Sequence, residues 1–420
     1  MSERHGSIAR VAAGAVVALV LAGCAAASND AVAPVATTVD VSILGASNPA
    51  TGTPVTIGFV TDGKTPAVDN TPEVEGAKAA AAYINEHLGG IKGHPLEIEV
   101  CETSMTPAGT ANCGSKMIDE GVPIVLGGTP GVVAPLVTGL EAAGVPYFAS
   151  TVADQTAILS PDVSLLANVL GFIAAPALLA QKAGYTRTVT VIVDVPAAVG
   201  PVKALAQPLY DKAGITHDFV PVPVGTPDMT PQVQAALNTD PQMFTVIGDP
   251  PFCTAALNAL STLGFTGTKF INSQCYNEQL ASTVNGGLEG VKVGATKSLD
   301  PDDTEVALYL AAMAKYGAPG IPPLEKNAPD GFAVTLAFAR AMNAGLQGDI
   351  TPASVKAALV SAPPQPVPLM AGQTFQCNRK AYKLTPAICS TGMSIITLDV
   401  DGKPVATEMA DTGTYFEPGS

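Results

Sequence analysis

Short apolar runs alternate with amphipathic stretches along most of the chain beyond residue 54. Residues 56–60 (TIGFV) are almost continuously apolar, as in a strand that is buried on both faces. The sequence Thr71-Pro72-Glu73 then combines a capping hydroxyl, a proline and an acid, which is typical of a helix start. Apolar residues recur at helical spacing from there to Gly89-Gly90. The pattern therefore predicts a strand followed by an amphipathic helix.

The same alternation continues to about residue 360. Further strands are predicted at 96–100, 123–126, 145–149, 188–193, 215–220, 243–247 and 269–271. Further helices are predicted over about 107–120, 132–143, 199–213, 230–239, 253–263, 303–316, 329–344 and 352–360, and the apolar stretch 165–180 predicts a buried helix. This spacing indicates an α/β fold with parallel sheets, and the length favours two doubly wound lobes. Residues 393–400 and 404–409 predict a terminal hairpin around Asp401-Gly402.

The first residues have the pattern of an export signal. Arg4 and Arg10 precede the apolar run 11–21, which is shorter than the roughly 20 residues that span a bilayer. Residues 21–24 (LAGC) resemble the lipobox of bacterial lipoproteins, which implies that residues 1–23 are a cleaved signal peptide and that Cys24 carries the lipid. The alternative is an ordinary signal peptide with an incidental cysteine. Residues 24–53 show no periodicity, and we expect a lipidated tether there.

The chain has seven cysteines, and six remain when Cys24 is set aside for the lipid. An even number in an exported protein suggests disulfides. The order along the chain favours three local pairs, which are Cys101–Cys113, Cys253–Cys275 and Cys377–Cys389. A metal site is the competing interpretation. Since the sequence has no C-x-x-C motif and its histidines are scattered, we expect no metal and no cofactor.

The net charge of −15 argues against nucleic acid as a partner, because nucleic acid requires a basic surface. The motifs of common hydrolases and nucleotide-binding proteins, such as G-x-S-x-G, H-E-x-x-H and the P-loop, are absent from the sequence. After signal cleavage only His87, His94 and His217 remain, and we expect ordinary packing or surface roles for them. We therefore expect a binding protein and no enzyme. An exported hydrolase with two acids across a cleft is the catalytic alternative.

An ordered set of short motifs resembles a known family. The set comprises Thr56-Ile57-Gly58-Phe59-Val60, Glu75-Gly76-Ala77, Tyr83-Ile84-Asn85, Gly89-Gly90-Ile91, Gly93-His94-Pro95-Leu96-Glu97, Gly127-Gly128, Gly144-Val145-Pro146-Tyr147, Ala149-Ser150-Thr151 and Leu263-Gly264-Phe265. It is similar to the type I periplasmic binding proteins, and more closely to the branched-chain amino acid binding proteins of ABC importers. The match is best over about 55–160 and rests on spacing and short pieces over 185–345.

This resemblance implies two lobes joined by a three-crossing hinge that close over a ligand. The N-terminal lobe would comprise 54–165 with about 277–345, and the C-terminal lobe 166–276 with about 346–420. It further implies a monomer that binds a small polar metabolite, delivers it to ABC permease subunits and is anchored by lipid to the outer face of the cell membrane, as in actinobacterial lipoproteins. A sensory or partner-presenting lipoprotein of the same fold is the alternative.

Parallel sheets bind ligands beyond the carboxyl ends of their strands. That rule nominates the loops 61–64, 102–104, 127–131, 150–154, 194–200, 249–252 and 272–276. A Gly-rich turn that enters a helix, such as 127–131, exposes backbone N–H groups. In the family this turn holds the ligand carboxylate with the help of a hydroxyl, for which Thr129 is available. A tight turn without a ligand is the alternative.

The expected ligand contacts are Thr129, Pro130, Gly131, Ser150, Thr151, Val152, Asp154, Val199, Asp249 and Tyr276. The resemblance places the polar head of the ligand at 150–154, where Asp154 pairs with an ammonium or else caps the next helix. Asp249 is likewise either a contact or a cap. Val199 stands near where the family often has a tyrosine, which makes an amino acid ligand doubtful, and Tyr276 offers an aromatic wall instead.

Overall fold

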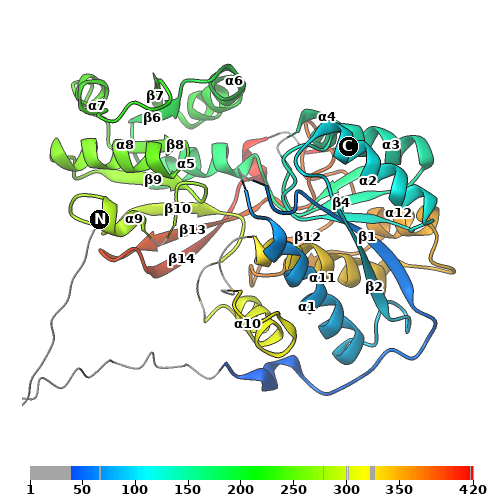
Figure 1. Cartoon of the computed structure of the whole chain (residues 1–420). Coiled ribbons are helices and arrows are strands. Elements are labelled where there is room, and N and C mark those ends of the chain that lie inside the picture. Colours follow the sequence, from blue (N-terminus) through cyan, green and yellow to red (C-terminus); the bar gives the residue numbers. More distant parts are fainter. Residues whose placement is uncertain are drawn as a thin grey trace, which may run out of the picture. The chain divides into compact units, whose positions relative to one another are not determined.

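The computed structural model of the protein describes residues 39–65, 68–152, 154–277, 279–298, 300, 302–321, 327–416 and 418–419. The expected signal peptide, the expected lipid site Cys24 and the first part of the expected tether lie outside these residues. Two β-sheets, each flanked by helices, organise the described chain (Figure 1). None of its described helices combines the length and the apolar character that a membrane crossing requires.

The first sheet is parallel and has the strand order β2-β1-β3-β4-β5. Its strands are β1 (Val55–Thr61), β2 (Leu96–Glu102), β3 (Val125–Gly127), β4 (Tyr147–Ala149) and β5 (Val163–Leu165). One face packs against α2 (Pro107–Asp119), α3 (Ala134–Ala143) and α4 (Gln155–Leu159). The other face packs against α1 (Thr71–His87), α10 (Thr304–Tyr316), α11 (Ala328–Gly345) and α12 (Pro352–Ser361). The short strands β11 (Gln365–Pro366) and β12 (Thr374–Phe375) lie beside α11 and its cluster.

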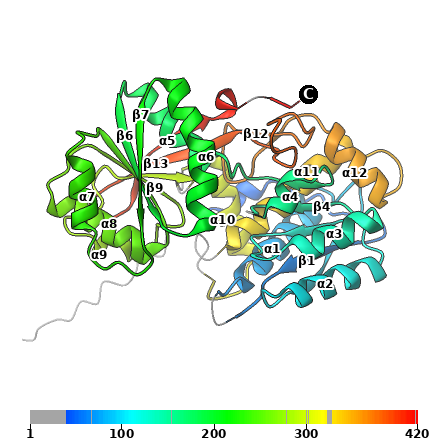
Figure 2. The ribbon, with the colours of Figure 1, turned by 90° about the horizontal axis from the view of Figure 1, so that it is seen from above.

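The second sheet has the order β14-β13-β10-β9-β8-β6-β7. Its parallel strands are β6 (Arg187–Val193), β7 (Thr216–Val222), β8 (Met243–Ile247), β9 (Thr268–Asn272) and β10 (Lys292–Ala295). The strands β13 (Gly392–Leu398) and β14 (Pro404–Asp411) form the predicted hairpin and extend the sheet in the antiparallel sense. Figure 2 shows α6 (Pro196–Ala213) on one side and α7 (Thr230–Leu237), α8 (Pro250–Thr262) and α9 (Leu280–Thr283) on the other. The helix α5 (Gly171–Lys182) and the 3-10 turn η2 (Gly413–Tyr415) pack on the α6 side.

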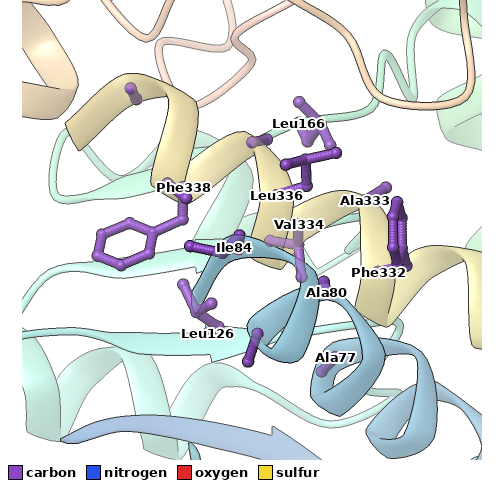
Figure 3. Packing of buried hydrophobic residues seen from close by; sticks show 14 of the residues in the cluster. Ala77, Ala80, Ile84, Leu126, Leu166, Phe332, Ala333, Val334, Leu336 and Phe338 are labelled. Atoms are coloured by element: carbon purple, nitrogen blue, oxygen red, sulfur yellow. The ribbon is translucent and has the colours of Figure 1, made fainter. Parts of the chain in front are cut away.

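Helices α1 and α11 pack against each other with their backbones in near contact. A Cβ atom on Gly76 would lie 1.9 Å from the carbonyl oxygen of Ala328, and one on Gly331 would lie 1.7 Å from that of Glu73. Only glycine fits at such a crossing, because any side chain would separate the two helices. Figure 3 shows the surrounding buried side chains, among them Ala77, Ala80, Ile84, Phe332, Ala333, Val334, Leu336 and Phe338. The crossing therefore fixes the starts of both helices beside each other.

The chain passes between the sheets three times, after β5, after β10 and before β13. The predicted α/β fold with two lobes and three crossings is therefore confirmed. The lobe boundaries differ from those expected at two places. Strand β10 lies in the second sheet because Val293 pairs with Ile271 of β9. Residues 346–390 belong with the first sheet instead, since α12 packs its buried Val355 and Leu359 into the cluster around α11.

Part of the segment expected as a tether is folded against the first lobe. The 3-10 turn η1 (Val41–Leu44) places Leu44, which is 3% exposed, into the cluster that includes α10. The backbone N–H groups of Asn48 and Ala50 donate to carbonyl oxygens at the end of α1. Residues 41–50 therefore pack against the first lobe, although they contain too few apolar residues to show a periodic pattern in the sequence.

The stretch 165–180 is only partly the predicted buried helix. Strand β5 ends at Leu165, and α5 begins at Gly171, whose N–H donates to the Asn168 side chain at 3.0 Å. The apolar character of residues 165–170 comes from a buried strand end and crossing, which periodicity alone does not distinguish from a helix.

The three predicted disulfides are confirmed. The pairs are Cys101–Cys113, Cys253–Cys275 and Cys377–Cys389, with Cα–Cα distances of 5.6, 5.6 and 4.3 Å. Each disulfide closes a short loop within one lobe. The first joins β2 to α2, and the second joins α8 to the loop after β9.

Candidate functional site

A cavity of about 700 Å³ lies between loops of the first sheet and loops of the second. The first sheet contributes the loops after β3 and β4, and the second contributes those after β9 and β10. The start of α11 and Phe172 of α5 complete the wall. The lining residues are Thr129, Pro130, Gly131, Thr151, Val152, Asp154, Phe172, Ser273, Gln274, Tyr276, Ala295, Thr296, Lys297, Asn327, Pro329 and Asp330.

Two backbone N–H groups of the Gly-rich turn 127–131 donate to acidic side chains of the same lobe. The N–H of Thr129 donates to Glu73 Oε2 at 2.9 Å, and the Thr129 hydroxyl points to the same oxygen at 3.4 Å. The N–H of Gly131 donates to Asp62 Oδ2 at 2.8 Å. A Cβ on Gly128 would lie 1.9 Å from Glu73 Oε2. The missing side chain at Gly128 is therefore what lets the Glu73 carboxyl reach the turn.

Glu73 and Asp62 are buried acids, with exposed fractions of 0% and 2%. Burial raises the pKa of Glu73 to about 8, and hydrogen bonds from the Thr61 hydroxyl and the Thr129 backbone N–H only partly oppose that effect. The Oε1 atom of Glu73 has no hydrogen-bond partner among the described residues. Asp62 accepts a second hydrogen bond, from the Thr103 hydroxyl at 2.7 Å. At neutral pH, therefore, Glu73 is largely protonated.

A second acid of the site, Asp330, lies in the first turn of α11 and is 3% exposed. It accepts a hydrogen bond from the Ser150 hydroxyl at 2.7 Å and pairs with the Lys297 ammonium at 2.6 Å. Lys297 follows β10, so this ion pair connects the crossing between the sheets to the floor of the cavity. The Ser150 hydroxyl is therefore hydrogen-bonded to Asp330, and Ser150 does not line the cavity.

The structure places most of the predicted contacts on one wall. Thr151 and Val152 line the cavity, as does Asp154, which also accepts hydrogen bonds from the N–H groups of Thr156 and Ala157 at the start of α4. Asp154 is thus both a helix cap and a wall residue. Tyr276 stands on the opposite wall, and its hydroxyl donates to the carbonyl oxygen of Gly402 at 2.8 Å.

Two predicted contacts lie elsewhere. Asp249 caps α8 through the N–H of Phe252 at 3.0 Å and lines a second cavity of about 1110 Å³ at the ends of β6 and β8. Gln274 lines both cavities, so they adjoin along the loop after β9. Val199 lies within α6 and lines neither cavity.

Sequence reasoning nominated the loop 61–64 without singling out its Asp62, and it missed the acids Glu73 and Asp330 and the cation Lys297. Glu73 and Asp330 follow a proline at a helix start, so their local role as first-turn acids explained them fully. Nothing in the sequence shows that these two helix starts, with their caps Asn70 and Asn327 hydrogen-bonded at 2.9 Å, lie side by side.

The histidines have structural partners. The Nδ1 atoms of His87 and His94 donate to the backbone carbonyl oxygens of Ala46 and Thr53, and His87 Nε2 is hydrogen-bonded to the Tyr316 hydroxyl. His217 stacks on Tyr210 with ring centres 3.6 Å apart. Burial lowers the pKa of His217 to about 3, so its ring is neutral near pH 7. Over the residues that the structure describes, no group of three or more acidic, cysteine and histidine side chains has an arrangement suited to a metal ion.

The sequence matches the family model described as periplasmic binding protein over residues 54–384. No curated protein matches it. Among solved structures, an ABC transporter substrate-binding protein from Sphaerobacter thermophilus has 17% identity over 87% of this chain and 99% of its own, with a TM-score of 0.68.

Two further solved structures were determined with ligands. The branched-chain amino acid transporter substrate binding protein from Streptococcus pneumoniae, in complex with isoleucine, has 18% identity over 85% of this chain and 99% of its own, with a TM-score of 0.60. A solute binding protein from R. palustris, in complex with 4-hydroxybenzoate, has 16% identity over 85% of this chain and 97% of its own, with a TM-score of 0.61. The fold is shared across all three. The family match spans most of the chain, and the protein belongs to the periplasmic binding proteins of type I.

Proposed function

We propose that the protein is an extracytoplasmic solute-binding lipoprotein of an ABC importer, and that two lobes close over a small polar metabolite, an amino acid or a related compound. The observation that carries the proposal is the cavity of about 700 Å³ whose walls come from both sheets. Small-molecule sites have volumes of roughly 300–1,000 Å³. Closure would bring the second cavity, with Asp249, toward the same ligand.

The ligand contacts that we assign are those of the predicted residues that line the walls. They are Thr129, Pro130, Gly131, Thr151, Val152, Asp154 and Tyr276, with Asp249 joining on closure. The relatives that hold isoleucine and 4-hydroxybenzoate differ in ligand class while sharing the fold. The ligand of this chain therefore follows from its own side chains.

A thermal-shift screen tests the binding role. The sample is the mature chain with Cys24→Ser, which prevents lipid attachment, produced in an oxidising compartment so that its disulfides form. A ligand that binds only the folded chain stabilises it by mass action, by about 2.7 kcal/mol at a hundredfold excess over Kd, and so raises the melting temperature. We expect at least one amino acid, amide, polyol or aromatic compound to do so. A flat response across all these classes would remove the proposal.

The anchor and the transport role need separate experiments. Cys24→Ser should move the full-length protein from the membrane fraction to the medium, and an unchanged distribution would contradict lipid attachment at this residue. Deletion of the gene should abolish uptake of the labelled ligand. Normal uptake with loss of a transcriptional response would instead indicate a sensor.

A further inference from the structure

The turn 127–131 is the part of the cavity where an anion would be expected to bind, since it leads into the start of α3. Three of its residues line the cavity, namely Thr129, Pro130 and Gly131. Proline has no N–H group, and the N–H groups of the other two already donate to Glu73 and Asp62. The wall residues of this turn therefore offer a ligand carboxylate no unoccupied backbone donor.

Displacing the two internal acids would be costly. Both are buried within the first lobe, so a ligand carboxylate that took a donor from either would cost that buried acid a hydrogen bond that water does not replace. Glu73 already carries one unpartnered oxygen. A Cβ atom on Gly128 would lie 1.9 Å from Glu73 Oε2, so any other residue at this position would have to displace the buried Glu73 carboxyl.

The charged side chains on the walls act in the same direction. In the described part of the chain, Lys297 is the single cation that lines the cavity, and its ammonium lies 2.6 Å from the Asp330 carboxylate. Asp154 and Asp330 line the same cavity. A ligand anion would meet these two carboxylates at close range, where like charges repel. A ligand that donates hydrogen bonds would find acceptors in them instead.

We infer that the cavity selects a solute without a carboxylate, one that presents hydrogen-bond donors such as an amide, a hydroxyl or an amine, because internal acids occupy the backbone donors that the wall residues of the turn 127–131 would offer to an anion. This inference rests on the proposed solute-binding function and narrows its ligand class. Asp62 and Glu73 are positioning residues in this account, since they act on the ligand through the backbone of the turn.

The test compares acids with their own amides. Calorimetric titration of the mature Cys24→Ser chain at pH 7 uses the pairs leucine and leucinamide, benzoate and benzamide, and propionate and propionamide, together with every acid found in the thermal-shift screen and its amide. We expect the amide of a pair to bind at least about tenfold more tightly than the acid. An acid that binds as tightly as its amide overturns the inference and leaves the solute-binding function intact. Absence of binding by every compound, polyols and amines included, removes the function and the inference with it.

Two variants identify the cause of the selectivity. Asp62→Ala removes a carboxylate and frees the Gly131 N–H, so the acid of the best pair should gain at least about tenfold in affinity. Asp62→Asn keeps the side-chain shape while removing the charge, and it serves as the second variant if Asp62→Ala fails to fold. The acid should gain affinity in Asp62→Asn as well, by a smaller factor. The matched control is Asp119→Ala, an exposed acid at the end of α2 in the same lobe that lines neither cavity. An equal gain in Asp119→Ala, or none in either Asp62 variant, contradicts the assigned role.

Discussion

Two strand-to-helix loops of this protein look alike in sequence and differ in how their backbone donors are satisfied. The loop after β8 is capped by its own Asp249, which accepts from the N–H of Phe252 three residues later. The loop after β3 is held by Asp62 and Glu73, which lie 69 and 56 residues away from their donors. A local cap is visible in the sequence. A cap that arrives from another element depends on the whole lobe, and it decides what the loop has left to offer a ligand.

The largest expected difference between the two loops is the dependence of the free energy of unfolding on pH, which Glu73 causes at the loop after β3. The folded chain keeps the Glu73 proton up to its pKa of about 8, whereas the unfolded chain loses it near the ordinary value of 4.5. The free energy of unfolding should therefore fall as pH rises between these values, by about 5 kcal/mol from this residue.

Glu73→Gln carries no titrating group and should lack this part of the decline. The measurement is urea unfolding of both proteins from pH 5 to pH 9. Parallel curves for the two proteins would show that Glu73 titrates normally and is not buried as described.

The second effect concerns Gly128. Because a Cβ atom there would lie 1.9 Å from the Glu73 carboxyl, Gly128→Ala must displace a buried acid and should cost about 2–3 kcal/mol. Gly200→Ala is the matched control in α6 of the second lobe, where a Cβ atom meets nothing within 4 Å. That control should be neutral or stabilise by about 0.5–1 kcal/mol, as alanine favours a helix over glycine. Equal destabilisation by Gly128→Ala and Gly200→Ala would contradict the close contact between Gly128 and the Glu73 carboxyl.

How much of the fold is predictable from the sequence follows from the range of the interactions. The strand β8 and the helix α1 were predicted nearly at their observed bounds, because a buried strand and a helix start are local patterns. The loops of the site were also predicted, since the carboxyl ends of parallel strands are known once the strands are.

The acids that accept from the backbone N–H groups of the turn 127–131 could not be predicted from the sequence. Glu73 and Asp330 each satisfy a local rule as first-turn acids, and that rule hides their convergence at the site. They meet because Gly76 and Gly331 let α1 and α11 approach, and a glycine inside a helix gives no information about its partner helix. The folding of residues 41–50 was also not predicted, because it depends on contacts with α10, which is distant in the sequence.

The smallest effect belongs to the second loop. Asp249→Ala removes one helix cap and should cost about 1 kcal/mol in urea unfolding. Because this cap is local and its loss leaves the donors of the turn 127–131 occupied, the preference for an amide over its acid should change less in calorimetry than in Asp62→Ala. A loss of that preference in Asp249→Ala would mean that the second loop sets the ligand class.

The claim that internal acids occupy the backbone donors of the turn 127–131 is tested most directly at the amide proton of Thr129. In a chain labelled with ¹⁵N-threonine, the Thr129 resonance should shift with pH about a midpoint near 8, because its N–H donates to the Glu73 carboxyl. Glu73→Gln should abolish that shift. A Thr129 resonance that stays constant from pH 6 to pH 9 in the unaltered chain, with its proton exchanging freely with water, would show that the turn is open and would contradict the account.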